Sequence, residues 1–96
     1  MTSEQTSAIS KLLFHDSAVR ITRHTLFPGC TTGVHTHDHD YVVVPLREGT
    51  VLVESSSEVA SFTMSRAEPY WRKSGVTHSL TNDSDMTIEF VELEYL

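Results

Sequence analysis

The chain has few basic residues, one cysteine and no long apolar run. Its 96 residues include 7 Lys and Arg against 13 Asp and Glu, a formal net charge of −6. A nucleic-acid-binding surface needs a basic face, so this balance argues against nucleic acid as a partner and, for the same reason, against an anionic membrane surface. Because Cys30 has no second cysteine to pair with, a disulfide-stapled secreted fold is not expected.

Targeting and membrane signals are also missing from the sequence. No apolar stretch approaches the ~20 residues of a membrane-spanning helix. The segment Met1 to Ser7 is polar and lacks the charged and apolar regions of a signal peptide. We therefore expect a cytoplasmic protein with one domain over residues 9–96, preceded by a flexible polar tail over residues 1–8.

After the tail, β-strand signals dominate. Alternating and β-branched runs predict strands over 19–26, 35–46, 51–53, 59–64, 70–72, 78–81 and 86–95. The best helix candidate, residues 5–13, is short and rich in Ser and Thr, so no helix is expected. Short strands at regular spacing predict an all-β sandwich or barrel.

The last predicted strand is apolar on both faces. Ile88 and Phe90 share one face, whereas Val91, Leu93 and Tyr95 share the other. Either this is a covered central strand, or one of its faces packs against a second subunit. Its acidic residues are interpreted as a solvated face: Glu89, Glu92 and Glu94.

The most informative motif is three histidines at every second position, His35, His37 and His39. An extended backbone sends alternate side chains to one face, so these imidazoles would point the same way. A neighbouring strand could add the distant His78. Because imidazole is the commonest metal ligand near neutral pH, the pattern predicts a metal site.

Two segments resemble the two signature motifs of the cupin superfamily. In the first, Gly29 is followed by five residues and then by His35-Thr36-His37, with Gly49 as the closing glycine. In the second, Gly75-Val76-Thr77-His78 is followed after three residues by Asn82, while Ala67 and Lys73 replace the family's glycine and proline. The resemblance covers more than half of the chain, and the flanking strands continue the expected pattern.

The first motif departs from the family in lacking its glutamate, whose place falls on Tyr41 or Val42. Val42 cannot bind a metal. Tyr41 shares its strand parity with His35 and His37, as does His39, although His39 could lie on a bend. Asp40 could reach a metal only if a bulge shifted the register.

The resemblance implies a small antiparallel β-barrel of jelly-roll type, a divalent transition metal inside it (Fe, Zn, Ni, Cu or Mn) and a homodimer. By the same resemblance the metal ligands are His35, His37 and His78, with His39 and Tyr41 as further candidates. Without the carboxylate, the metal's charge would favour a small anionic organic ligand. A dioxygenase or an isomerase would fit such a site. A non-catalytic ligand-binding or sensing module and a metal-free, pH-sensing barrel are the alternatives.

Residues outside the motifs receive simpler interpretations. Cys30 is expected to be structural, because no adjacent cation would lower the pKa of its thiol. His15 and His24 are expected to be ordinary surface or hydrogen-bonded residues. Three arginines could bind an anionic ligand if they faced the interior, which alternation alone cannot decide: Arg20, Arg23 and Arg72.

Overall fold

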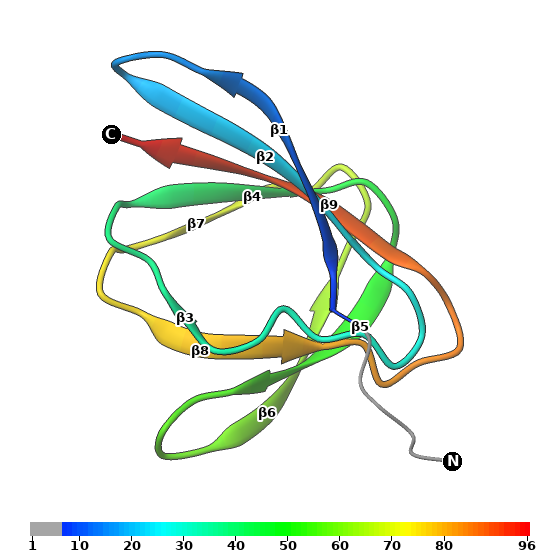
Figure 1. The fold of residues 1–96 in the computed structure, drawn as a ribbon. Helices are drawn as coiled ribbons and strands as arrows, with labels where there is room; N and C mark the ends of the chain where they lie inside the picture. The colour runs from blue at the N-terminus through cyan, green and yellow to red at the C-terminus, as the bar shows by residue number, and fades with distance from the viewer. Residues whose placement is uncertain (1–6) are drawn as a thin grey trace.

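The computed structural model describes residues 7–96, which form nine strands in two antiparallel sheets and contain no helix (Figure 1). The strands are β1 (Ile9–His15), β2 (Val19–Leu26), β3 (His35–Thr36), β4 (Tyr41–Pro45), β5 (Gly49–Glu54), β6 (Val59–Met64), β7 (Tyr70–Arg72), β8 (Thr77–Thr81) and β9 (Ile88–Tyr95). One sheet has the order β1-β2-β9-β4-β7 and the other β3-β8-β5-β6. The predicted all-β, jelly-roll architecture is confirmed, although the two sheets do not join into one closed sheet. None of the described residues forms a helix that could cross a membrane.

The predicted strands over 19–26, 59–64 and 70–72 coincide with β2, β6 and β7. The prediction of one strand over 35–46 is wrong, because β3 ends at Thr36 and β4 begins at Tyr41. Strand β1 was not predicted. Its side chains are all exposed, and its register shifts between Leu12 and Phe14, so its sequence shows no clear alternation.

Residues 1–6 of the predicted tail lie outside the described residues. At the end of that segment, Ser7 forms a parallel bridge with Thr31, and the amide of Ala8 donates to the Thr31 carbonyl at 2.9 Å. The chain is therefore tied to the four-stranded sheet two residues before β1 begins, since Thr31 also bridges to Thr81 in β8.

The core lies between the two sheets (Figure 1). Its fully buried side chains come from both: Leu26, Cys30, Tyr41, Val43, Val51, Met64, Leu80, Ile88 and Phe90. Strand β4 alternates between buried and half-buried residues, as a strand with one covered face should. Gly49 allows the sheets to approach closely, because a Cβ there would lie 2.8 Å from Cγ1 of Ile88. Cys30 is buried and unpaired, consistent with its expected structural role.

Strand β9 lies between β2 and β4, so the interpretation as a central strand is correct for its inner face. Ile88, Phe90 and Glu92 point inward, and all three are buried. The interpretation of the acidic residues as a solvated face is wrong for Glu92 and Glu89, each only 8% exposed. Glu89, on the outer face, is covered by guanidinium groups that bond to its carboxylate.

Candidate metal centre

Three imidazoles from two sequence segments meet inside the barrel. His35 in β3 and His78 in β8 are direct cross-strand partners, and His37 follows two residues after His35. One ligand nitrogen from each of the three lies within 4.8 Å of the others. The ring centroids are 4.8 Å apart for His35 and His37 and 5.2 Å for His37 and His78. The cluster is partly to fully buried, with His37 only 5% exposed.

The backbone of the second motif holds His37 in place beyond the end of β3. The amide of His37 donates to the Val76 carbonyl at 2.9 Å, and the amide of Gly75 donates to the His37 carbonyl at 2.8 Å. Gly75 has φ +98°, a conformation that favours glycine, so this turn depends on it. The two motifs are thus joined by main-chain hydrogen bonds as well as by their histidines.

The Nε2 atoms of the histidines point at one another, and that of His78 has no other partner among the described residues. Nδ1 of His35 donates to the Gly33 carbonyl at 2.9 Å, which leaves its Nε2 unprotonated in the neutral ring. That atom lies 3.1 Å from Nε2 of His37. Two nitrogens on one ion at about 2.1 Å would be roughly 3.0 to 3.4 Å apart. Nε2 of His78 is buried without a hydrogen-bond partner in the described structure, so an ion at this point would satisfy it.

Burial keeps two of the three imidazoles neutral. It lowers the pKa of His37 below the ordinary 6.5, more strongly than the nearby Glu92 raises it. Burial, helped by the charges of His35 and His37, lowers the pKa of His78 to about 4. A metal binds the deprotonated ring, so these shifts favour metal over proton at neutral pH.

Sequence reasoning missed a carboxylate beside the histidines, that of Glu92 in β9. Its Oε2 lies 3.9 Å from Nε2 of His37, and its Oε1 accepts from Nε2 of His24 at 3.1 Å. The other ring nitrogen of His24, Nδ1, bonds to Oγ of Ser10 at 2.9 Å. Burial acts to raise the pKa of Glu92, but the hydrogen bond and charge of His24, with the charge of His37, lower it overall.

Sequence reasoning missed Glu92 because it could not establish the register in which β9 pairs with β4. Glu92 in β9 is the cross-strand partner of Val43 in β4, and so faces the interior that the motif glutamate would have entered. Nothing local in the sequence distinguishes Glu92 from its neighbours Glu89 and Glu94. The expectation that the loss of the motif glutamate leaves no carboxylate beside the histidines is therefore wrong.

The other ligand candidates differ in their distance from the three histidines. His39 lies in a bend between β3 and β4 and is not part of the three-histidine cluster. The ring of Tyr41 stacks on His37, with centroids 3.9 Å apart at 17°, and burial raises the pKa of its phenol to about 12. Asp40 accepts a hydrogen bond from the Ser74 amide at 2.8 Å and so fixes the second-motif turn. Tyr41 as a ligand stays a prediction.

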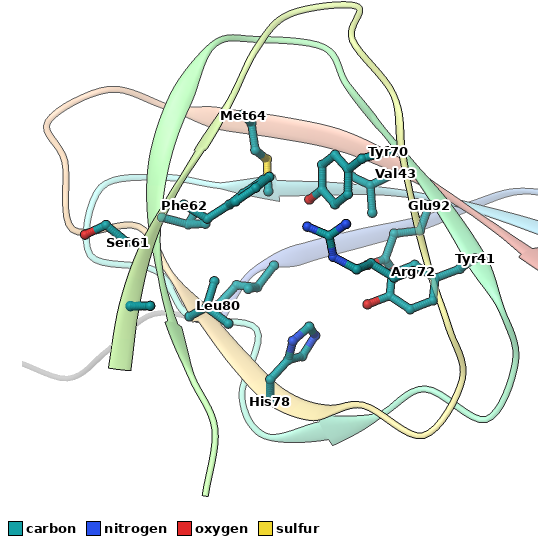
Figure 2. Close-up of a pocket in the computed structure, with 13 residues that line it drawn as sticks. Tyr41, Val43, Ser61, Phe62, Met64, Tyr70, Arg72, His78, Leu80 and Glu92 are labelled. Atoms are coloured by element: carbon teal, nitrogen blue, oxygen red, sulfur yellow. The ribbon is translucent and has the colours of Figure 1, made fainter. Parts of the chain in front are cut away.

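A cavity of about 250 Å³ between the two sheets is lined by His78 of the three-histidine cluster (Figure 2). Its polar wall includes Tyr41, His78 and Glu92, and the remainder is mostly apolar. A second hollow of about 250 Å³ lies against His24, His35 and Glu92. Glu92 lines both spaces, so it lies on the boundary between them.

The three arginines differ in their surroundings. Arg20 forms a bidentate ion pair with Glu94, at 2.8 Å for Nε–Oε1 and 3.1 Å for Nη2–Oε2. Arg23 bonds to Glu89 on the outer face of the sheet. Arg72 alone of the three lines the cavity beside His78.

Comparisons with known proteins agree with this geometry. No sequence-family model matches the chain. The Beta-alanine degradation protein BauB of Pseudomonas aeruginosa is 37% identical over 92 residues, which cover 96% of this chain and 97% of the relative. The crystal structure of a cupin domain from Bordetella pertussis Tohama I matches with a TM-score of 0.96 and 34% identity, over 99% of both chains. An RmlC-like cupin family protein with a double-stranded β-helix fold from Methanocaldococcus jannaschii, only 14% identical, shares the fold with a TM-score of 0.76 over 99% of this chain and 84% of its own.

Proposed function

Because the chain belongs to the cupin superfamily, we propose that it holds a divalent transition metal on His35, His37 and His78 and binds a small anionic organic ligand beside it. One observation carries the proposal. Nε2 of His78 is buried without a partner at the point where the other two imidazoles converge. A buried polar atom normally has a partner, so the arrangement fits an ion better than it fits a metal-free core.

The three imidazole donors narrow the choice of metal ion. Imidazole suits Zn, Cu, Fe and Ni, whereas Mn is usually bound by oxygen ligands. When bound, the metal would supply Lewis-acid or dioxygen chemistry at an open coordination position. Neighbouring groups would orient the ligand rings: the backbone carbonyl of Gly33 fixes the His35 ring, Tyr41 packs flat on His37, and Glu92 places a negative charge nearby.

The test compares two histidine variants prepared metal-free and then loaded with one defined metal at a time. His37→Ala should lose most of the bound metal, because it removes a central ligand. His39→Ala, two residues away, is the matched control and should keep it. Metal content is measured by elemental analysis after removal of free ion, and a thermal melt verifies folding. Equal metal content in wild type and His37→Ala would refute the metal assignment.

A small organic acid is the ligand class that we propose. The name of the Pseudomonas relative concerns β-alanine, which is itself a small carboxylic acid. For an enzyme, dioxygenase and isomerase are the candidate classes. The alternative is a non-catalytic binding or sensing module. Oxygen uptake and product analysis with the iron-loaded protein separate these: recovery of the acid unchanged, with binding intact, favours the module.

We also propose a homodimer through the outer face of the five-stranded sheet. Cross-strand partners place one apolar row across all five strands: Phe14, Ile21, Leu93, Val42 and Trp71. Trp71 is 53% exposed and Phe14 49%. A continuous apolar row across an outward sheet face is typical of an interface.

Since Trp71 is the single tryptophan, its fluorescence reports on this face directly. Dilution should shift the emission to longer wavelength as the dimer dissociates, and Trp71→Lys should sediment as a monomer. Val59→Lys, an exposed apolar residue of the other sheet, is the control and should leave the dimer intact. A wild-type protein that is monomeric at every concentration would contradict the homodimer.

The unpaired, buried Cys30 and the acidic net charge support a cytoplasmic location and a partner that is not nucleic acid.

A further inference from the structure

Arg72, the last residue of β7, faces the interior of the barrel. Its cross-strand partner is Tyr41, which is 2% exposed and points inward, so Arg72 shares the inner face. Figure 2 shows its guanidinium extending into the cavity between Tyr70, Tyr41 and His78. The cation therefore lies in the space next to the histidine cluster.

Aromatic rings hold the guanidinium in place. Cζ of Arg72 lies 4.4 Å from the ring centroid of Tyr70 and 5.5 Å from that of Phe62. The two rings also pack edge-on against each other, with centroids 4.9 Å apart. A cation over an aromatic ring uses the face of the guanidinium, so the N–H groups along its edge can still donate hydrogen bonds.

The charge of Arg72 has no counterion among residues 7–96. Arg20, Arg23 and Arg47 all form ion pairs with glutamates, whereas Arg72 forms none in that part of the chain. Its one recorded hydrogen bond there goes from Nη1 to the carbonyl of Trp71, its own neighbour in the chain. A cation that packs against aromatic rings in a cavity and has no ion-pair partner is suited to an anionic ligand.

We propose that Arg72 recognises the carboxylate of the ligand, and that the cavity selects a small monocarboxylate with a short apolar body. This inference rests on the proposed ligand-binding function and names its substrate class. The planar fork of a guanidinium matches the two oxygens of a carboxylate. The two carboxylates near the site already have partners of their own, because Glu94 pairs with Arg20 and Glu92 accepts a hydrogen bond from His24.

The rest of the cavity wall determines the size and polarity of the ligand's body. Phe62, Met64 and Leu80 give the cavity an apolar wall (Figure 2). At about 250 Å³, the space is below the roughly 300–1,000 Å³ typical of pockets for drug-sized molecules. A second carboxylate at the far end would lie against this apolar wall without a counterion, so dicarboxylates should bind less well.

The test uses butyrate as the probe and butyramide, its uncharged analogue, as the matched ligand. Binding is titrated by NMR on both metal-free and zinc-loaded protein. Butyrate should bind more tightly than butyramide and than succinate. Arg72→Gln should weaken butyrate binding by about tenfold or more while leaving butyramide unaffected, because only the charged fork is lost. The butyrate affinity of Arg72→Lys should lie between those of wild type and Arg72→Gln, since lysine keeps the charge but not the planar guanidinium.

Arg66→Gln is the control, an exposed arginine outside this cavity, and should bind butyrate as wild type does. Metal content and thermal stability are measured on every variant. Equal butyrate affinity in Arg72→Gln and Arg66→Gln would overturn the assignment, as would no butyrate binding to wild type. Tighter binding of methyl phosphate than of butyrate would also overturn it. A wild-type protein that binds no metal, yet loses butyrate through Arg72→Gln, would refute the metal site and leave the carboxylate site standing.

Discussion

Oε2 of Glu92, in the last strand, lies 3.9 Å from Nε2 of His37, in the loop after β3. The sheet register brings the two together, because β9 pairs with β4 and Glu92 faces the same interior as Tyr41 and Val43. The chain lacks the motif glutamate of its family, but the carboxylate of Glu92 lies buried beside His37. The carboxylate comes from a different strand, and His24 holds it from the opposite side.

The first prediction concerns that carboxylate. Glu92→Gln keeps the shape and an oxygen that can accept from His24, but it removes the negative charge. Metal affinity should fall by about 10- to 100-fold, the range typical of lost outer-sphere partners. Competition with a coloured chelator measures it. Glu89→Gln is the matched control, in the same strand on the opposite face, and should change metal affinity little. Similar affinities for the two variants would contradict a role for Glu92 at the site.

The second prediction concerns the metal-free protein at acid pH. Burial lowers the pKa of His78 from 6.5 to about 4, so between these values the unfolded chain binds a proton that the folded chain does not. The free energy of unfolding should therefore fall as pH falls from about 6.5 to about 4, by up to about 2–3 kcal/mol from His78. His37, also lowered, adds in the same direction.

Urea unfolding at a series of pH values measures this slope. His78→Gln should flatten it, whereas His15→Gln, an exposed histidine in β1, should not. A slope that is unchanged in His78→Gln would show that this imidazole is not buried neutral. Metal loading should fail only as pH falls to about 4 and below, because protons then compete with the metal for the nitrogen of folded His78.

The third prediction concerns Ala67, which stands where the second motif of the family has glycine. Its φ is +61°, in the left-handed region that costs an alanine roughly 1–2 kcal/mol. Ala67→Gly should raise the free energy of unfolding by about 0.5–1 kcal/mol, after the greater flexibility of glycine in the unfolded chain is subtracted. Ala18→Gly, in an exposed turn with an ordinary φ, should lower it instead. Thermal melts compare the two, and a lower melting temperature for Ala67→Gly would contradict the strain.

The fourth prediction concerns Asn82, fully buried at the end of the second motif. Its Nδ2 donates to the carbonyls of Leu26 at 2.8 Å and Met86 at 2.7 Å, and its Oδ1 accepts from the amide and hydroxyl of Ser84. Asn82→Ala removes all four hydrogen bonds and the Nδ2 donor to the buried Leu26 carbonyl, whereas the Met86 carbonyl keeps the Ser84 hydroxyl, so the change should cost about 3 kcal/mol. Its exposed neighbour provides the control, since Asp83→Ala should cost less than about 0.5 kcal/mol. Chemical denaturation measures both, and equal small effects would contradict the anchoring role of Asn82.

Strand identity was largely predictable from local patterns. Residues 19–26 and 59–64 alternate or are rich in β-branched residues, and both runs match the observed strands. The prediction was poor at β1, where a bulge disrupts the alternation, and at residues 37–40, where the chain leaves the strand. Consequently, strand alternation predicted that His39 would point the same way as His35 and His37, whereas it lies in a bend.

By itself, the sequence determined the fold class and three converging histidines, because both follow from local period and from two motifs whose residues directly shape their own turns. Only the tertiary structure decided which face of each strand is inside. Alternation groups Glu92 with Glu94, and Tyr70 with Arg72, but it does not say which side of the sheet they take. That choice depends on long-range pairing between β4, β7 and β9, which no short segment encodes, and it brings Glu92 and Arg72 to the site.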